Sequence, residues 1–158
     1  MRLFHRLIVP VDGSPPSARA IEAATKIAVD SGAELLFCSV VDRNRLIAEA
    51  SQMPFSDPTP AIDAVTEGCR RILSVALAAA RAAGANARAE LCEGEPVSAI
   101  IRVAGEHDGD LIVMGSHGRS GIGRLLLGST TEGVLRRSNV PVLVVSEKAT
   151  VRGEVQRG

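Results

Sequence analysis

Glycines and hydroxyl side chains gather in residues 111–130, where an apolar run leads into a glycine-rich segment. The glycines that permit close backbone approach, and the hydroxyls after them, are Gly115, Gly118, Gly128, Ser129 and Thr130. A helix that begins there adds its unpaired N–H groups and a partial positive charge, and both favour an anion. The residue types and their spacing therefore predict a phosphate-binding loop.

A carboxylate follows the first apolar run, where Pro10 and Val11 lead into Asp12. Ligands of doubly wound sheets bind at the carboxyl ends of the strands, where the strand order reverses. If the first and fourth strands are neighbours, Asp12 and Gly115 face one crevice. Asp12 then accepts hydrogen bonds from ribose hydroxyls, or helps to hold a Mg²⁺ ion that bridges phosphates. The alternative is a structural role for Asp12 in an Asx turn or a helix cap.

Two familiar phosphate-binding motifs are excluded. Residues 123–130 approach a Walker A loop, but Ser129 stands where that loop requires lysine. Residues 121–126 lack the third glycine of a dinucleotide-binding motif and follow the wrong strand. P-loop NTPase chemistry and Rossmann-type dinucleotide binding are therefore not predicted.

Charged side chains near the glycines have two interpretations each. Arg119 and Arg124 either bind phosphates or solvate the loop, and His117 either contacts a phosphate or transfers protons. Phosphoryl transfer needs positioned cations and a residue that orients the nucleophile. No partner carboxylate can be assigned to His117, so no catalytic residue is predicted and any ATPase activity is expected to be slow.

Short apolar runs alternate with segments of helical periodicity, which is typical of βαβ units and a parallel sheet. The predicted strands are residues 6–11, 34–41, 86–92, 110–114 and 140–145. Helices are predicted from Ser14 to about Gly32, from about Ile62 to Gly84, from Glu95, and from Ser129 towards Ser138. The fold class is therefore α/β, a doubly wound parallel sheet with helices on both faces.

Some local features are less regular. Residues 129–132, Ser-Thr-Thr-Glu, match a capping box, which alone would explain Ser129. Residues 42–60 contain three prolines that forbid one continuous helix, and we expect a flexible loop there. Residues 147–158 are polar and aperiodic, and we expect a frayed C-terminal tail.

Composition restricts the class of protein. A chain of 158 residues with 46% hydrophobic residues suits one domain, here residues 1–146. Its 18 basic and 18 acidic residues balance, so neither nucleic acid nor an acidic membrane is an expected partner. The three cysteines have neither metal-ligand nor disulfide spacing, and no segment has transmembrane length. We therefore expect a cytoplasmic protein with core cysteines; His5 and His107 are interpreted as surface residues at element ends.

The pattern Gly115-x2-Gly118-x9-Gly128-Ser129, with residues 11–14 (Val-Asp-Gly-Ser) near the start, resembles the universal stress protein family over essentially the whole chain. The resemblance implies a five-stranded sheet of order 3-2-1-4-5 and ATP binding, with ADP or AMP as alternatives. By position it implies that nucleotide contacts come from Pro10, Val11, Asp12, Val40, Met114, Gly115, His117, Gly118, Arg119, Gly128, Ser129 and Thr130. Thr130 stands where many such sequences have valine, and we do not expect this difference to abolish binding.

The last apolar run favours self-association. Pro141 cannot donate to a β-ladder and suits an edge strand or the start of a strand. Residues 142–145 are too apolar to form an edge strand that stays exposed to solvent. A homodimer through residues 140–146 satisfies both observations, and the resemblance points the same way; the alternative is a helix of the same chain over that edge. The function hypothesis is a nucleotide-binding regulatory or stress-response switch read by an unknown protein partner. The alternatives are a nucleotide-independent dimeric interaction protein and a slow nucleotide phosphohydrolase.

Overall fold

The computed structural model describes residues 2–117 and 127–150, and its core is one parallel β-sheet of five strands in the order β3-β2-β1-β4-β5. The elements in chain order are β1 (Arg6–Pro10), α1 (Pro15–Ser31), β2 (Glu34–Val41), α2 (Arg43–Ala50), α3 (Thr59–Ala82), β3 (Asn86–Glu93), α4 (Pro96–Glu106), β4 (Leu111–Gly115), α5 (Ser129–Arg137) and β5 (Val142–Val145). This order confirms the predicted fold class. Each predicted strand is present, with ends displaced by no more than two residues.

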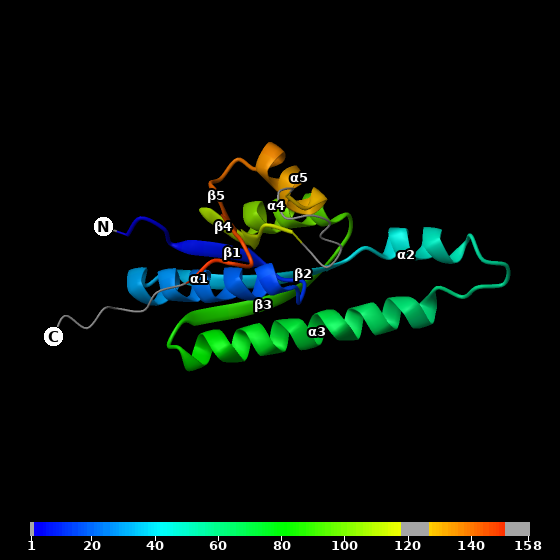
Figure 1. The fold of residues 1–158 in the computed structure, drawn as a ribbon, viewed down its shortest axis with the longest axis horizontal. Coiled ribbons are helices and arrows are strands. Elements are labelled where there is room, and N and C mark those ends of the chain that lie inside the picture. Colours follow the sequence, from blue (N-terminus) through cyan, green and yellow to red (C-terminus); the bar gives the residue numbers. More distant parts are fainter. Residues whose placement is uncertain (1, 118–126, 151–158) are drawn as a thin grey trace.

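The sheet is covered on both faces, and each face has its own apolar core (Figure 1). On one face α1 and α3 contribute a row of alanines and leucines to the first core. On the other face α4 and α5 contribute the second core, which contains Ile100, Val103 and Val134. Strands buried on both faces are apolar at every position rather than at alternate ones. This is why β1 and β4 could be found as continuous apolar runs.

The strand order reverses between β1 and β4. β1 pairs with β2 on one side and with β4 on the other, and the register Ile8↔Ile112 makes Val11 level with Gly115. The chain leaves β1 for α1 on one face and leaves β4 for α5 on the opposite face. The carboxyl ends of these two strands are therefore the place where a doubly wound sheet binds its ligand, and we call the space beyond them the crevice.

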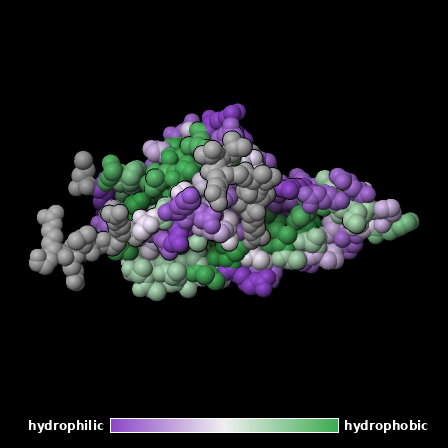
Figure 2. All heavy atoms as spheres, viewed as in Figure 1, coloured by the Kyte–Doolittle hydropathy of each residue, from purple (hydrophilic) through white to green (hydrophobic). Residues whose placement is uncertain are grey.

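The loop predicted over residues 42–60 contains a helix. Residues 43–50 form α2, which the carboxylate of Asp42 caps by accepting a hydrogen bond from the backbone N–H of Arg45 at 3.1 Å. The prolines begin only at Pro54, so nothing prevents a helix before it. α2 buries none of its residues, and with the first half of α3 it projects from the body as an arm (Figure 1). Figure 2 shows apolar side chains at its tip, where Met53 is 66% exposed.

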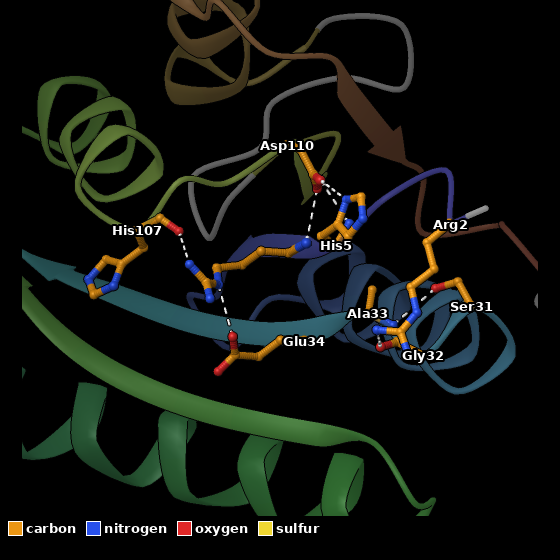
Figure 3. Close-up of polar contacts among 9 residues, drawn as sticks. Arg2, His5, Ser31, Gly32, Ala33, Glu34, His107 and Asp110 are labelled. Atoms are coloured by element: carbon orange, nitrogen blue, oxygen red, sulfur yellow. Dashed lines mark hydrogen bonds and ion pairs between the residues drawn. The ribbon is translucent and has the colours of Figure 1, made fainter.

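Ionic contacts connect neighbouring strands at the end of the sheet where β1 and β2 begin (Figure 3). The carboxylate of Glu34 forms ion pairs with two guanidinium groups: its Oε2 lies 2.9 Å from the Nε of Arg6, and its Oε1 lies 2.6 Å from the Nε of Arg88. Burial raises the pKa of Glu34, but the two guanidinium groups outweigh burial and the pKa is lowered. Asp110 accepts the backbone N–H groups of His5 and Arg6 at 2.7 and 3.0 Å. Charged side chains of the protein itself therefore stabilise this end of the sheet.

Three further expectations concern the cysteines, the tail and the membrane. Cys38, Cys69 and Cys92 are free and buried, as expected for core residues. Of the predicted tail, Ala149 packs against the first core, and residues 151–158 lie outside the described residues. Among the helices that the structure describes, none is long and apolar enough to cross a membrane.

Candidate functional site

The N-terminus of α1 satisfies its own hydrogen-bond donors. Pro15 and Pro16 carry no N–H, and the N–H of Ser17 donates to the Oγ of the N-cap residue Ser14 at 3.3 Å. The Oγ of Ser17 in turn lies 3.2 Å from the N–H of Asp12. No N–H group in this first turn is therefore directed at the crevice.

Asp12 forms the Asx turn that was one of its two interpretations. Its Oδ1 accepts a hydrogen bond from the backbone N–H of Ser14 at 2.9 Å, and the residue is half-buried at the end of β1. The turn holds the carboxylate at the crevice, beside Ser14. The ribose and Mg²⁺ roles of Asp12 stay predictions.

Gly115 ends β4 where the strand meets the start of α1. A Cβ atom at Gly115 would lie 2.8 Å from the carbonyl carbon of Pro16 and 2.9 Å from the backbone nitrogen of Ser17. Both are backbone atoms, so the clash could not be relieved by a side-chain rotation. The glycine is therefore required by the packing of the protein itself, whatever it contributes to a ligand.

Thr131 joins the start of α5 to the same point and was missed by the sequence analysis. Its Oγ1 donates to the carbonyl of Gly115 at 2.8 Å, and the side chain is 2% exposed. The sequence offered one signal, a third hydroxyl residue directly after Ser129 and Thr130. Its partner lies sixteen residues earlier in the chain, so no local pattern identifies the contact.

The N-terminus of α5 lacks a side-chain cap, and the predicted capping box is wrong. Gly128 is the N-cap residue, with extended backbone angles, and Ser129 already lies inside the helix. Glu132 does not reach back; its carboxylate instead pairs with Arg136 at 2.7 Å. The N–H of Gly128 donates to the carbonyl of Ser116 at 2.8 Å, and the first intrahelical bond runs from Glu132 N–H to Gly128 O at 2.9 Å. Helix geometry therefore leaves the N–H groups of residues 129–131 without intrahelical acceptors.

The other helices of the described chain have acceptors of their own at this position. The carboxylate of Glu95 accepts the N–H groups of Val97 and Ser98 at 3.0 and 2.8 Å and thereby caps α4. These backbone hydrogen bonds, first that of Ser98, lower the pKa of Glu95. Asp42 caps α2, and Asp57 accepts the first N–H of α3 at 2.9 Å. Within the described residues, α5 is thus the helix whose first turn is best prepared for an external anion.

The remaining predicted contact residues separate into two groups. Pro10 and Val40 are half-buried at the carboxyl ends of β1 and β2, and Thr130 is half-buried beside the exposed Ser129. Val11 and Met114 are buried in the two cores on opposite faces of the sheet, which leaves their main chains as the groups at the crevice.

The residues after β4 are described only in part. The imidazole Nδ1 of His117 lies 3.2 Å from the Oγ of Ser116, and its carbonyl lies 3.5 Å from the Oγ of Ser14. Gly118, Arg119 and Arg124 lie outside the described residues. The described part of the site therefore combines the open first turn of α5, a carboxylate at Asp12 and apolar surface at Val40. These groups are suited to a phosphate, a sugar hydroxyl and a flat apolar ring, respectively.

Comparison with known proteins identifies the family. A model described as the universal stress protein family matches residues 3–146. The universal stress protein MJ0531 of Methanocaldococcus jannaschii is 33% identical over 148 residues, covering 92% of this chain and 84% of that protein.

Solved structures agree with the fold. The universal stress protein UspA from Lactobacillus plantarum is similar with a TM-score of 0.78 and 26% identity, covering 92% of this chain and 99% of that one. A universal stress protein solved in complex with cAMP has a TM-score of 0.66 and 31% identity, covering 92% of this chain and 98% of that one.

Proposed function

This chain belongs to the universal stress protein family, and from that premise we propose that it binds an adenine nucleotide and acts as a regulatory or stress-response switch. The proposed site is the crevice at the carboxyl ends of β1 and β4. The phosphates lie at the first turn of α5, beside Gly128, where residues 129–131 supply N–H groups and Ser129 and Thr130 supply hydroxyl groups. Asp12 contacts the ribose or a Mg²⁺ ion, and Val40 lies beside the base.

One observation carries this proposal, namely the uncapped first turn of α5 at the point where the strand order reverses. An anion there gains the helix dipole and N–H groups of the kind that the other described helices give to side-chain oxygens of their own. The cAMP complex of a 31% identical protein supports an adenine nucleotide as that anion. The glycine pattern of the family supports a nucleotide with a phosphate chain, and we propose ATP, with ADP and AMP as alternatives.

The composition of the chain makes the first test direct. It contains no tryptophan and no tyrosine, so a purine that copurifies dominates the absorbance near 260 nm. Calorimetric titration of nucleotide-free protein with ATP and MgCl₂ is expected to show saturable heat. If ATP, ADP, AMP and cAMP all give no heat at millimolar concentration, and no purine copurifies, the proposal is wrong.

Two measurements separate the alternatives. A nucleotide-independent interaction protein keeps its partner binding when ATP is added or removed, whereas a switch changes it. A slow phosphohydrolase releases phosphate continuously, well above a Gly118→Ala control. We expect binding without sustained turnover.

We also propose a homodimer through residues 140–146. β5 is the last strand of the sheet, and Leu143 on it is 38% exposed. Pairing two such strands across a twofold axis would cover this apolar edge. Sedimentation at micromolar concentration is expected to show a dimer, and a monomer would contradict it.

A further inference from the structure

A second group of converging side chains lies away from the crevice, where the end of α4 meets β3. A ring nitrogen of His107 and one carboxylate oxygen each from Glu90 and Glu106 all lie within 4.8 Å of one another. His107 Nε2 is 2.7 Å from the Oε2 of Glu90. Glu90 belongs to β3, Glu106 is the last residue of α4, and His107 is its C-cap residue. The consecutive elements β3 and α4 thus direct three donor groups at one point.

The donor types favour a particular class of cation. An imidazole nitrogen with two carboxylates suits a borderline metal ion such as Zn²⁺, whereas Mg²⁺ and Ca²⁺ prefer oxygen ligands alone. The group also lies at the C-terminus of α4, where the helix dipole places partial negative charge and favours a cation. This second feature is independent of the side chains.

The competing interaction is weak. The Nε of Arg102 lies 3.7 Å from Glu106, in a pair whose side chains are 48% and 56% exposed. Solvent-exposed pairs of this kind contribute little to stability. A divalent ion can therefore displace this arginine from Glu106 at little cost.

Hydrogen bonds and strand pairing fix the backbone of the residues that would supply the metal ligands. The N–H of His107 donates to the carbonyl of Val103 at 3.1 Å, and its own carbonyl accepts from the Arg6 guanidinium. Figure 3 shows that this contact uses the main chain, while the imidazole points away from Arg6. Glu90 is paired with Cys38 in the β2–β3 ladder. A bound ion would draw the donor atoms, which already lie within 4.8 Å of one another, closer together by rotation of the side chains.

We propose that Glu90, Glu106 and His107 form a Zn²⁺-binding site, with three protein ligands and the remaining position open to solvent. The ion would connect β3, which forms one edge of the sheet, to the end of α4. An ion bound only by the folded chain stabilises it by linkage. The site is independent of the proposed nucleotide crevice.

The test is a titration of the metal-free full chain with ZnCl₂, without nucleotide because ATP chelates the ion. Calorimetry is expected to show one ion per chain, and the melting temperature is expected to rise as Zn²⁺ is added. His107→Gln and Glu90→Gln are each expected to weaken Zn²⁺ binding at least about tenfold. The matched control is Glu93→Gln, on the same strand but outside the group, which should bind as the natural chain does.

Two results would overturn the inference. One is no saturable binding of Zn²⁺ at 100 µM, which would leave the group as an ordinary ion pair. The other is equal binding by the natural chain, His107→Gln and Glu90→Gln, which would assign the ion to other groups such as the thiols. If Glu90→Gln loses its fold by circular dichroism, Glu106→Gln decides, because Glu106 is exposed and the His107–Glu90 pair survives its loss.

Discussion

The first turns of α1 and α5 lie on the two sides of the same crevice, and they use their hydrogen-bond donors in opposite ways. α1 begins with two prolines and a serine cap, so its donors are removed or satisfied by the chain. α5 begins at a glycine, and within the described residues no side chain caps it, so the N–H groups of residues 129–131 have no acceptor within the helix. The start of α1 is satisfied by the chain itself, and the start of α5 is where we propose that the phosphates bind. The contact of Gly115 with both starts sets their relative position.

The largest effect is expected where the two starts meet. Gly115→Ala places a Cβ 2.8–2.9 Å from backbone atoms of residues 16 and 17, which must then move. Overpacking of this kind is expected to lower the free energy of unfolding by about 2–3 kcal/mol, measured by urea denaturation. Gly68→Ala is the matched control, because nothing lies within 4 Å of its Cβ. It should raise stability by about 0.5–1 kcal/mol, and equal effects of the two changes would contradict the packing argument.

The second largest effect is expected from removing the Thr131–Gly115 hydrogen bond, which links α5 to β4. Thr131→Val keeps the shape but leaves the carbonyl of Gly115 without its buried donor, at an expected cost of about 1–3 kcal/mol. Thr131→Ser retains the hydroxyl and should lose less. If α5 holds phosphates, Thr131→Val should also weaken ATP binding more than adenosine binding in calorimetry. Equal losses for both ligands would show that the link does not position the phosphate site.

The two serines give the sharpest contrast. Ser14→Ala removes the cap of α1 and is expected to cost about 1 kcal/mol in thermal or urea unfolding. Ser129→Ala removes an exposed hydroxyl without a capping role, so stability should change by less than about 0.5 kcal/mol. ATP affinity is expected to fall about tenfold for Ser129→Ala, the equivalent of one hydrogen bond to a charged group. The contrast fails if Ser129→Ala destabilises the chain as much as Ser14→Ala.

The smallest effect concerns α4, whose start holds an anion of its own. Backbone hydrogen bonds lower the folded pKa of Glu95 below its ordinary value of 4.5. Its contribution to stability is therefore present above that value and is lost as the pH falls through the lower folded pKa. Urea unfolding between pH 7 and pH 3 should show a smaller loss for Glu95→Gln than for the natural chain. Identical pH profiles would mean that this exposed carboxylate contributes nothing measurable.

Much of the fold could be predicted because its signals are local. The strands at β1 and β4 were continuous apolar runs, and Ser14 followed by Pro15 marked the start of α1. α2 was missed because three prolines nearby suggested a loop, although the residues before Pro54 are free to form a helix. The cap of α5 was misplaced by one residue, since Gly128 and Ser129 are both acceptable N-caps and only the backbone angles distinguish them.

The candidate site was predicted less completely than the fold. Residue type and spacing singled out Asp12, Gly115 and Ser129, whose binding roles stay predictions, and the structure brings the ends of β1 and β4 together as expected. The core positions of the Val11 and Met114 side chains were not foreseen, because a strand buried on both faces gives no alternation from which to read direction. Thr131 was missed because its partner is distant in sequence.

By itself the sequence determined the strands, the helices other than α2, and the places where glycine and proline restrict the backbone, because these depend on neighbouring residues. The tertiary structure decided which helix begins without a side-chain cap and what Gly115 packs against. It also brought the side chains of Glu90 and His107 into contact. These features depend on which distant segments meet when the sheet closes, and a buried contact or a shared hydrogen bond exists only after that assembly.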